Sequence, residues 1–497
     1  MTLAVRGRTE SDQTEPARGL LSSSRRIAIA EHLGISYELH EVPAAPGIER
    51  MRLAASGAEL LWTSAVESAG PPVEAHIQSA GTSIPIFGRV LNDTLAERVL
   101  DQRGGSWSRA VALLDSDGAA LASIWASEDG NVFLPFDPDE VCENYWSERY
   151  LELARSGASR RLQRQAVRVY YRVRDLLPRR TQIALRRLYA YKQRRRQFPA
   201  WPAESALHDF FDLFTAILTD LAGEPLPRIA AWPHGHAWAL VLTHDIEETV
   251  GLRALDQVLE LERDFDLRSS LNFVPRRYEV SDERIERLHA DGFEVGVHGL
   301  YHDGRDLESR ELLEARLPEI RAAAERWGAV GFRSPATHRD WELMPLLGFD
   351  YDTSYPDTDP FEPQDGGCCT WLPFFNQAMV ELPLTMPQDH TMFEILRHPD
   401  ETVWTEKADF LRARGGMAMI DTHPDYLIDE RIMRAYERLL ERYAEDPSAW
   451  KPLPREVSDW WRRRATSRIQ WAGTGWIVTG PAAQEARVEL VEARPWR

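Results

Sequence analysis

The feature that most constrains the fold is an apolar segment at residues 237–250, which reads AWALVLTHDIEETV. Five of the six residues from Trp238 to Thr243 are apolar, which predicts a strand buried on both faces of a sheet. Two acids, Asp245 and Glu247, follow directly. In parallel α/β folds, the loops at the carboxyl ends of the strands carry the chemistry. We therefore expect both carboxylates at the mouth of a site.

Reactive side chains also follow later strands of the same region. Between residues 238 and 427 strand and helix patterns alternate, which predicts a parallel sheet or barrel. The reactive residues at the predicted strand ends or in the loops after them are His298, His302, Arg333, Asp389 and His423. Chance would scatter such residues over both ends of the strands, so this pattern indicates one shared site.

The pair His298 and His302 suggests a metal ligand set. Two histidines four residues apart can bind one ion if the residues between them form a helical turn, and imidazole is a common zinc ligand. A His-x-x-x-His pair by itself is weak evidence. Its position at the end of a buried strand, like that of Asp245 and Glu247, is what favours a metal site.

The length of 497 residues exceeds what one hydrophobic core serves, so several domains are expected. Short strands separated by turn residues predict an α+β accessory domain in the first third of the chain. The predicted units are a loose tail (1–24), this accessory domain (25–150), a basic helical linker (151–230), the α/β catalytic unit (231–445) and a C-terminal helix with a small β extension (446–497).

Charge and cysteine content exclude some functions. A formal net charge of −19 argues against nucleic-acid binding. The three cysteines, Cys142, Cys368 and Cys369, show neither a disulfide pattern nor zinc-thiolate spacing, which is typical of a reducing compartment. Neither a signal-peptide pattern nor an apolar run of about 18 residues is present, so we expect a cytoplasmic protein.

The basic segment 160–196 differs from the rest of this acidic chain. It holds fourteen Arg or Lys against one acid, Asp175, and Pro178 divides it into two predicted helices. One interpretation is an amphipathic surface for peripheral contact with an anionic membrane or an anionic saccharide carrier. The other is a pair of linker helices whose arginines pair with the acidic remainder of the protein.

The ordered motifs THDIE, HGLYH, FRSP and IDTH resemble those of the polysaccharide deacetylases, carbohydrate esterase family 4, over about residues 238–427. The resemblance implies a distorted (β/α)7 barrel and a divalent metal, usually zinc. It also implies a hydrolase of carbon–nitrogen bonds other than peptide bonds, which removes the acetyl group from an N-acetylated sugar.

The resemblance also implies a role for each motif residue. The metal ligands would be Glu247, His298 and His302. Asp245 would be the general base, Arg333 would pair with it, His423 would be the general acid, and Asp389 would orient His423.

Several positions depart from the family pattern or allow two interpretations. Glu247 stands where the family usually has Asp, so Asp245 and Glu247 can exchange roles. His244 replaces an aromatic residue and is either a packed imidazole or an extra ligand, whereas His338 and His390 are predicted in substrate loops. The pair Trp460–Trp461 either stacks on sugar rings or docks the tail helix.

Three functions stay open from the sequence. The first is a metal-dependent deacetylase acting on a polysaccharide or its cytoplasmic precursor. The second is a non-catalytic saccharide-binding or scaffolding protein, and the third is a hydrolase of a different amide. Neither the sugar nor the oligomeric state follows from the sequence.

Overall fold

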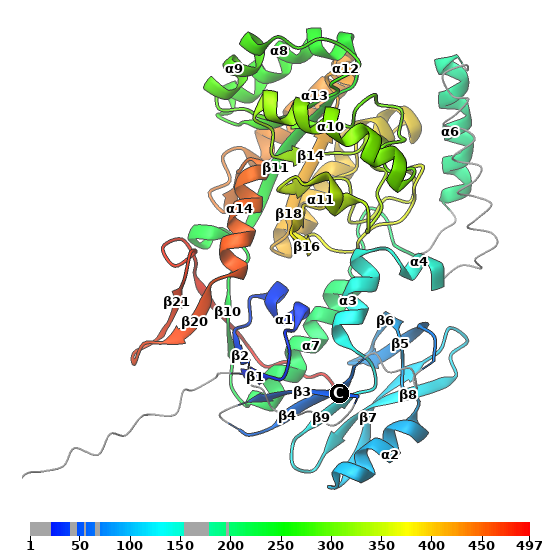
Figure 1. The fold of residues 1–497 in the computed structure, drawn as a ribbon, viewed down its shortest axis with the longest axis vertical. Helices are drawn as coiled ribbons and strands as arrows, with labels where there is room; N and C mark the ends of the chain where they lie inside the picture. The colour runs from blue at the N-terminus through cyan, green and yellow to red at the C-terminus, as the bar shows by residue number, and fades with distance from the viewer. Residues whose placement is uncertain (1–20, 40–46, 54–55, 65–69, 154–177, 195–197) are drawn as a thin grey trace, which may run out of the picture.

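The computed structural model describes residues 21–39, 47–53, 56–64, 70–153, 178–194 and 198–497. Figure 1 shows two large sheets, one in the N-terminal part of the chain and one in the segment that carries the motifs. Within the described ranges, no helix is both long and apolar enough to cross a membrane.

The first sheet has the strand order β2-β1-β3-β4-β9-β8-β7-β5-β6. Its longest pairings are antiparallel hairpins, as the alternating strands and turns of the sequence predict. In the turn between β7 and β8, the carboxylate of Asp115 accepts the amide hydrogens of Asp117 and Ala119. The strands are β1 (Leu21–Ser23), β2 (Tyr37–Leu39), β3 (Ile48–Leu53), β4 (Glu59–Thr63), β5 (Val73–Ser79), β6 (Thr82–Gly88), β7 (Trp107–Leu114), β8 (Ala120–Ser127) and β9 (Val132–Leu134).

Helices connect this sheet to the second one. In α7 thirteen of seventeen residues are buried, so this helix lies inside the protein. Farther along, Arg339 Nε donates to Glu148 Oε2 over 3.0 Å and joins the segment after α3 to the second sheet's loops. The helices of this part are α1 (Ala28–Leu33), α2 (Asp93–Arg103), α3 (Pro138–Trp146), α4 (Tyr150–Leu153), α6 (Arg179–Gln193) and α7 (Ala206–Ala222).

The second sheet carries the motif residues. Its order is β16-β17-β15-β14-β13-β12-β11-β18, and all neighbours are parallel except the pair of β16 and β17. All nine residues of β11 are buried, which confirms the predicted central strand. The strands are β11 (Trp238–Ile246), β12 (Ser269–Phe273), β13 (Glu294–Val297), β14 (Gly331–Phe332), β15 (Tyr351–Asp352), β16 (Phe374–Asn376), β17 (Met379–Glu381) and β18 (Met417–Thr422).

The mixed α/β class is therefore confirmed, and the barrel stays a prediction. Within the described residues, no strand pairing joins the outer strands β16 and β18. The chain after β17 does approach β18, since Met386 N donates to Met419 O over 3.0 Å. The boundaries of the predicted domains also stay predictions.

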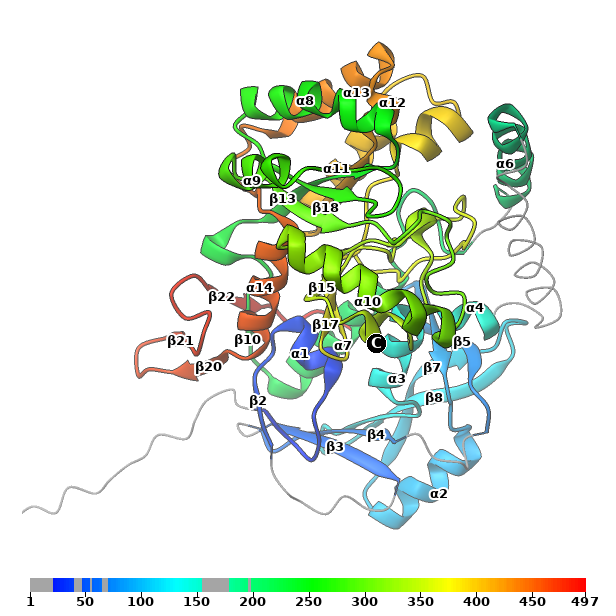
Figure 2. The ribbon, with the colours of Figure 1, turned by 45° about the horizontal axis from the view of Figure 1, so that its top comes forward.

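Helices pack around this sheet (Figure 2). They are α8 (Thr249–Asp264), α9 (Asp282–Ala290), α10 (Arg310–Trp327), the π-helix η6 (His390–Ile395), α11 (Thr402–Ala413), α12 (Pro424–Leu427), α13 (Glu430–Tyr443) and α14 (Pro454–Ala465). Three short 3₁₀ turns are η3 (Pro233–Gly235), η4 (Pro335–Thr337) and η5 (Met344–Leu347). In α13, buried Ile432, Leu439 and Tyr443 share one face, as a helix lying against a sheet requires.

The C-terminal segment returns to the body of the protein. Trp460 and Trp461 on α14 are buried, and Trp460 Nε1 donates to Ala231 O over 2.7 Å. The interpretation in which these tryptophans dock the tail helix is therefore confirmed. Beyond α14, β20 (Arg468–Trp471) pairs with β21 (Trp476–Thr479), and β22 (Val488–Val491) pairs with β10 (Leu226–Ile229). A short strand, β19 (Ala449–Trp450), pairs with the start of β11.

Of the basic segment, residues 178–194, which include α6, lie within the described residues; residues 160–177, with Asp175, and residues 195–196 lie outside them. Arg186 donates to Phe361 O and lies 3.8 Å from Glu362, and Arg187 lies 3.7 Å from Glu394. These two arginines pair with the rest of the protein, as the linker interpretation expects.

Candidate active site

Asp245 lies at the carboxyl end of β11 and is buried. Its Oδ1 accepts hydrogen bonds from Asn272 Nδ2 (2.8 Å) and Arg333 Nη1 (3.1 Å). Asn272 is the register partner of Asp245 on β12, so strand pairing itself brings the amide to the carboxylate. Because both donors hold Oδ1, the orientation of the carboxylate is fixed.

Gly296 makes room for Asn272. The two residues are register partners on β13 and β12. A Cβ atom at position 296 would lie 2.1 Å from Asn272 Oδ1, far closer than real contacts allow. Glycine at this position therefore lets the Asn272 side chain lie across β13 and reach Asp245.

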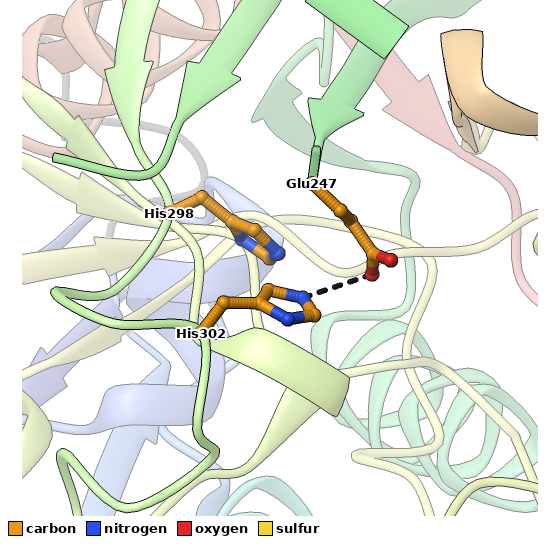
Figure 3. Close-up of side chains that lie close together, drawn as sticks. All are labelled: Glu247, His298 and His302. Atoms are coloured by element: carbon orange, nitrogen blue, oxygen red, sulfur yellow. Dashed lines mark ion pairs between the residues drawn. The ribbon is translucent and has the colours of Figure 1, made fainter. Parts of the chain in front are cut away.

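The three predicted metal ligands converge. One ligand atom each from Glu247, His298 and His302 lies within 4.8 Å of the others (Figure 3). His302 Nε2 is 2.9 Å from Glu247 Oε1. The side chain of Glu247 is 24% exposed, whereas those of the two histidines are 2% and 8% exposed, so the group opens to solvent on the Glu247 side.

The donor atoms suit a divalent cation. His298 Nδ1 lies 3.1 Å from Arg333 O; since a carbonyl only accepts, Nδ1 carries the proton and Nε2 keeps its lone pair. That Nε2 is buried and has no hydrogen-bond partner in the described structure. Two imidazoles and one carboxylate with an open side are typical of catalytic zinc sites. The residues therefore fit a metal ion.

His298 and His302 converge without a helical turn between them. The segment is a loop in which Gly299 (φ +64°) and His302 (φ +58°) adopt left-handed conformations. Asp306 shapes this loop, because its Oδ2 accepts the Leu300 amide hydrogen over 3.1 Å. A Cβ at Gly299 would lie 2.6 Å from that same oxygen, so the loop needs glycine there.

Asp425 holds the loop that carries Glu247. Its carboxylate accepts the amide hydrogens of Glu247 (3.3 Å) and Gly251 (3.0 Å). This residue, two positions after His423, was missed at the level of sequence. Its place within the IDTHPD run is the one signal that points to it.

His423 faces the same centre from β18. Its Nδ1 lies 2.6 Å from Asp389 Oδ1, and its amide donates to Asp389 Oδ2 over 2.7 Å. Its Nε2 lies 3.7 Å from Glu247 Oε1 and 3.8 Å from Asp421 Oδ2. Asp389 thus fixes both the backbone and the ring of His423 and leaves Nε2 directed at the carboxylates.

Arg333 is fully buried and joins two strand ends. Its Nη1 lies 3.1 Å from Asp245 Oδ1 and 2.6 Å from Asp421 Oδ1. Its Nε donates to Thr353 Oγ1 and its Nη2 to Thr243 Oγ1, each over 2.9 Å. Asp421 was not among the predicted site residues, although it lies one residue before the end of β18, the strand that His423 follows.

Burial and charge set different protonation states for the two acids beside Arg333. Burial raises the pKa of Asp245, but the charges of Arg333 and His298 outweigh it and lower that pKa to about 2. Burial raises the pKa of Asp421 well above its ordinary value. The positive charge of Arg333 lowers this pKa, but the negative charge of Asp245 raises it further. Asp245 is therefore ionised at neutral pH, whereas Asp421 holds its proton to a higher pH than an ordinary aspartic acid does.

At both His423 and Glu247, the neighbouring charges shift the pKa more than burial does. Burial lowers the pKa of His423, but the Asp389 carboxylate raises it more, so this pKa lies well above the ordinary value. Burial raises the pKa of Glu247, but the neighbouring His302 lowers it to well below the ordinary value. The site thus places an anionic carboxylate beside a protonated imidazole.

His244 is not part of this group. It is buried, its Nε2 lies 2.6 Å from Glu262 Oε1, and its Nδ1 lies 2.8 Å from Thr422 Oγ1. These contacts agree with the packed-imidazole interpretation. His390 begins η6, and its ring lies 5.3 Å from that of Tyr426. The predicted roles of His338 and His390 in substrate loops stay predictions.

No protein-family model matches the chain, and no curated protein matches it either. Solved structures match about half of it. The chain resembles the polysaccharide deacetylases. A protein assigned to them from Mycobacterium smegmatis matches at 16% identity with a TM-score of 0.40, covering 50% of this chain and 97% of that one. Another from Pseudomonas aeruginosa matches at 18% identity and TM-score 0.39, over 48% and 95%.

The matches also include an allantoinase, PuuE, at 18% identity and a TM-score of 0.38, covering 46% of this chain and 91% of that one. At such identities and TM-scores, these likenesses do not define an activity. The function proposed below therefore rests on the side chains of the site itself.

Proposed function

We propose that this protein is a metal-dependent hydrolase that removes the acetyl group from an N-acetylated sugar of a polysaccharide or its precursor. The supporting observation is the convergence of the three-residue donor group with an ionised carboxylate and a protonated imidazole. The groups involved are Glu247, His298 and His302 as donors, Asp245 as the carboxylate and His423 as the imidazole.

Glu247, His298 and His302 would hold the cation, for which zinc is the proposed identity. When bound, a divalent cation would polarise the acetamido carbonyl and lower the pKa of a water molecule by several units. Glu247 is assigned as the ligand carboxylate because it contacts His302 directly and reaches the open side of the group.

Asp245 would act as the general base. Its Oδ1 is held by Asn272 and Arg333, and its Oδ2 lies 3.5 Å from His298 Nε2, beside the donor group. This oxygen would take a proton as the water oxygen bonds to the acetamido carbon. Arg333 acts as a positioning residue, because its charge keeps Asp245 ionised and its hydrogen bond keeps Oδ1 in place.

His423 would act as the general acid. As the carbon–nitrogen bond breaks, its Nε2 would give a proton to the departing amine, which leaves acetate and a free amino sugar. Asp389 positions this ring through Nδ1. Asp389 would therefore orient His423, the role that the sequence analysis expected for it.

Acetate release and metal content test the proposal together. Zinc-loaded protein is given a panel of N-acetylhexosamine glycans, and Asp245→Asn is expected to lower kcat by about 10²–10⁴ while keeping the metal. The matched control is Asp256→Asn, an equivalent change at a carboxylate on α8 whose side chain is 70% exposed. The control should release acetate at the unchanged rate.

Each alternative has its own result. Full acetate release by Asp245→Asn would remove this residue from the base role. Metal and saccharide binding without acetate release by the unchanged protein would favour the saccharide-binding or scaffolding function. Release of a different acid from another amide would favour a hydrolase of that amide.

A further inference from the structure

Exposed apolar side chains are concentrated around the site and on α6. Ten large hydrophobic residues are exposed among the residues that the structure describes, and six of them lie in these two places. Three are on α6, and three lie beside the proposed catalytic groups. The other four are Leu39, Trp471, Ile477 and Leu490, on strands β2, β20, β21 and β22.

The helix α6 presents two different faces. One face contacts the protein: Arg186 and Arg187 bond to backbone oxygens, and Ala190 packs with Phe361 and Ile395. The opposite face, at the spacing of helical turns, carries Leu185 (44% exposed), Leu188 (70%) and Tyr191 (65%). Both views place α6 at the outer edge of the molecule (Figures 1 and 2).

The charge of α6 is opposite to that of the whole protein. The helix reads RRTQIALRRLYAYKQ, with five basic residues and no acid, in a chain of net charge −19. Lys192 is exposed beside the apolar stripe of Leu185, Leu188 and Tyr191. Exposed apolar residues interleaved with cationic ones are typical of helices that lie in the head-group region of an anionic membrane.

Three exposed apolar residues, called the apolar rim below, lie in segments directly next to residues of the site. Val250 (49% exposed) lies in the first turn of α8, just after Glu247; Tyr301 (42%) precedes His302; and Ile428 (51%) follows α12. Helices α8 and α12 pack against each other, so two of these residues come from neighbouring elements. Exposed apolar residues gathered in one place are typical of interaction surfaces.

The helix and the rim are connected through η6. Ala190 of α6 packs on Ile395 of η6, and η6 starts directly after Asp389, the partner of His423. The ring of His390, the first residue of η6, lies 5.3 Å from that of Tyr426 on α12, two residues before Ile428. The helix η6 thus contacts α6 and adjoins residues of the site.

We propose that α6 and the apolar rim seat this protein on an anionic lipid membrane. The second part of the proposal rests on the function proposed above: the substrate is an N-acetylated saccharide carried on a lipid. The cationic helix binds the head groups, its leucines and tyrosine enter the interface, and the rim meets the lipid end of the substrate. The net negative charge of the remaining chain leaves α6 as the face that an anionic surface attracts.

Vesicle sedimentation tests the membrane surface without any need for activity. The full protein is mixed with vesicles of phosphatidylcholine alone or with added phosphatidylglycerol. It should bind the anionic vesicles, and added salt should weaken that binding. Lys192→Gln should lower the partition coefficient about five-fold, and Leu188→Ser with Tyr191→Ser should lower it about ten-fold or more.

The matched control is Ile477→Ser with Leu490→Ser, which removes two equally exposed apolar residues from the C-terminal strands. These changes should leave vesicle binding unchanged. Equal binding by the α6 variant and the unchanged protein, or no preference for anionic vesicles, would overturn the membrane proposal. A dimer in solution that the α6 variant dissociates, without vesicle binding, would assign the surface to a second copy instead.

Acetate release then tests the substrate. The probes are an N-acetylhexosaminyl diacylglycerol in anionic vesicles and a soluble N-acetylhexosamine oligosaccharide. The α6 double variant should lose about ten-fold in kcat/KM on the vesicle substrate alone. Equal losses on both probes, or release only from the soluble one, would overturn the lipid-carried substrate. Vesicle binding without acetate release from either probe would refute the proposed function and leave the membrane surface supported.

Discussion

Replacing Glu294 with glutamine should make the protein more stable above neutral pH. Glu294 opens β13, the strand that leads to His298, and it is buried. Its Oε1 accepts from Tyr351 Oη (2.8 Å) and its Oε2 from the Arg455 amide (3.1 Å). Burial outweighs these hydrogen bonds and raises its pKa from 4.5 to about 7.

The sign and size of the effect follow from proton binding. Between pH 4.5 and 7 the folded protein holds a proton on Glu294 that the unfolded chain releases, so stability falls as pH rises through this window. The shift of the pKa from 4.5 to about 7 corresponds to about 3 kcal/mol of unfolding free energy. The folded protein loses this contribution to its stability above pH 7. Glutamine keeps a neutral group that can donate to Tyr351 Oη and accept from the Arg455 amide.

Urea unfolding followed by tryptophan fluorescence, at several pH values between about 4 and 8, measures this difference. The unfolding free energy of Glu294→Gln minus that of the unchanged protein should rise with pH by about 3 kcal/mol and then level off. Other buried carboxyls titrate equally in both proteins and cancel in the subtraction. If the unfolding free energies of the two proteins change in parallel with pH, Glu294 does not have the raised pKa on which this prediction depends.

Three further predictions concern the site. Asp389→Asn should lower kcat by about 10²–10⁴ with little change in KM, because His423 loses its carboxylate partner; steady-state acetate release measures this. Gly296→Ala should cost about 1–3 kcal/mol and reduce kcat, since its Cβ would meet Asn272 Oδ1 at 2.1 Å; urea unfolding and kinetics check it. His302→Gln should lose the bound metal, which elemental analysis of the purified variant measures.

Matched controls accompany these variants. Gly475→Ala adds a Cβ with no heavy atom of the protein within 4 Å, so stability and kcat should not change. His76→Gln changes a histidine on β5, in the other sheet, and should keep the metal content. Unchanged stability and kcat in Gly296→Ala, full metal content in His302→Gln, or unchanged kcat in Asp389→Asn would each contradict the role given to that residue.

Much of the catalytic segment could be predicted from local patterns. Strand β11 is buried along its whole length, so its apolar run identified it without knowledge of its neighbours. The sequence likewise predicts strands at Ser270–Val274, Phe293–Val297 and Met417–Ile420, each within two residues of the observed bounds of β12, β13 and β18. The sequence predicts a strand at Phe349–Tyr355, whereas the observed β15 has only two residues, because so short a strand sets no clear periodicity.

Contacts between side chains on different strands could not be predicted from local sequence patterns. Asn272 reaches Asp245 because parallel register pairs the two strands, and Gly296 matters only because it lies beside Asn272. Asp425 contacts Glu247 across 178 residues of chain. No local pattern encodes these pairings, since each partner looks like an ordinary strand or loop residue by itself.

Hydrophobic periodicity and residue type are local properties, so they predict which chemical groups stand at the ends of the central strands. How those groups act depends on contacts that form only when the chain folds. Register and loop conformation brought Glu247, His298 and His302 together, and the charge of Arg333 kept Asp245 ionised while burial raised the pKa of Asp421. Protonation depends on the distances and solvent exclusion that folding creates, and these exist only when remote segments meet.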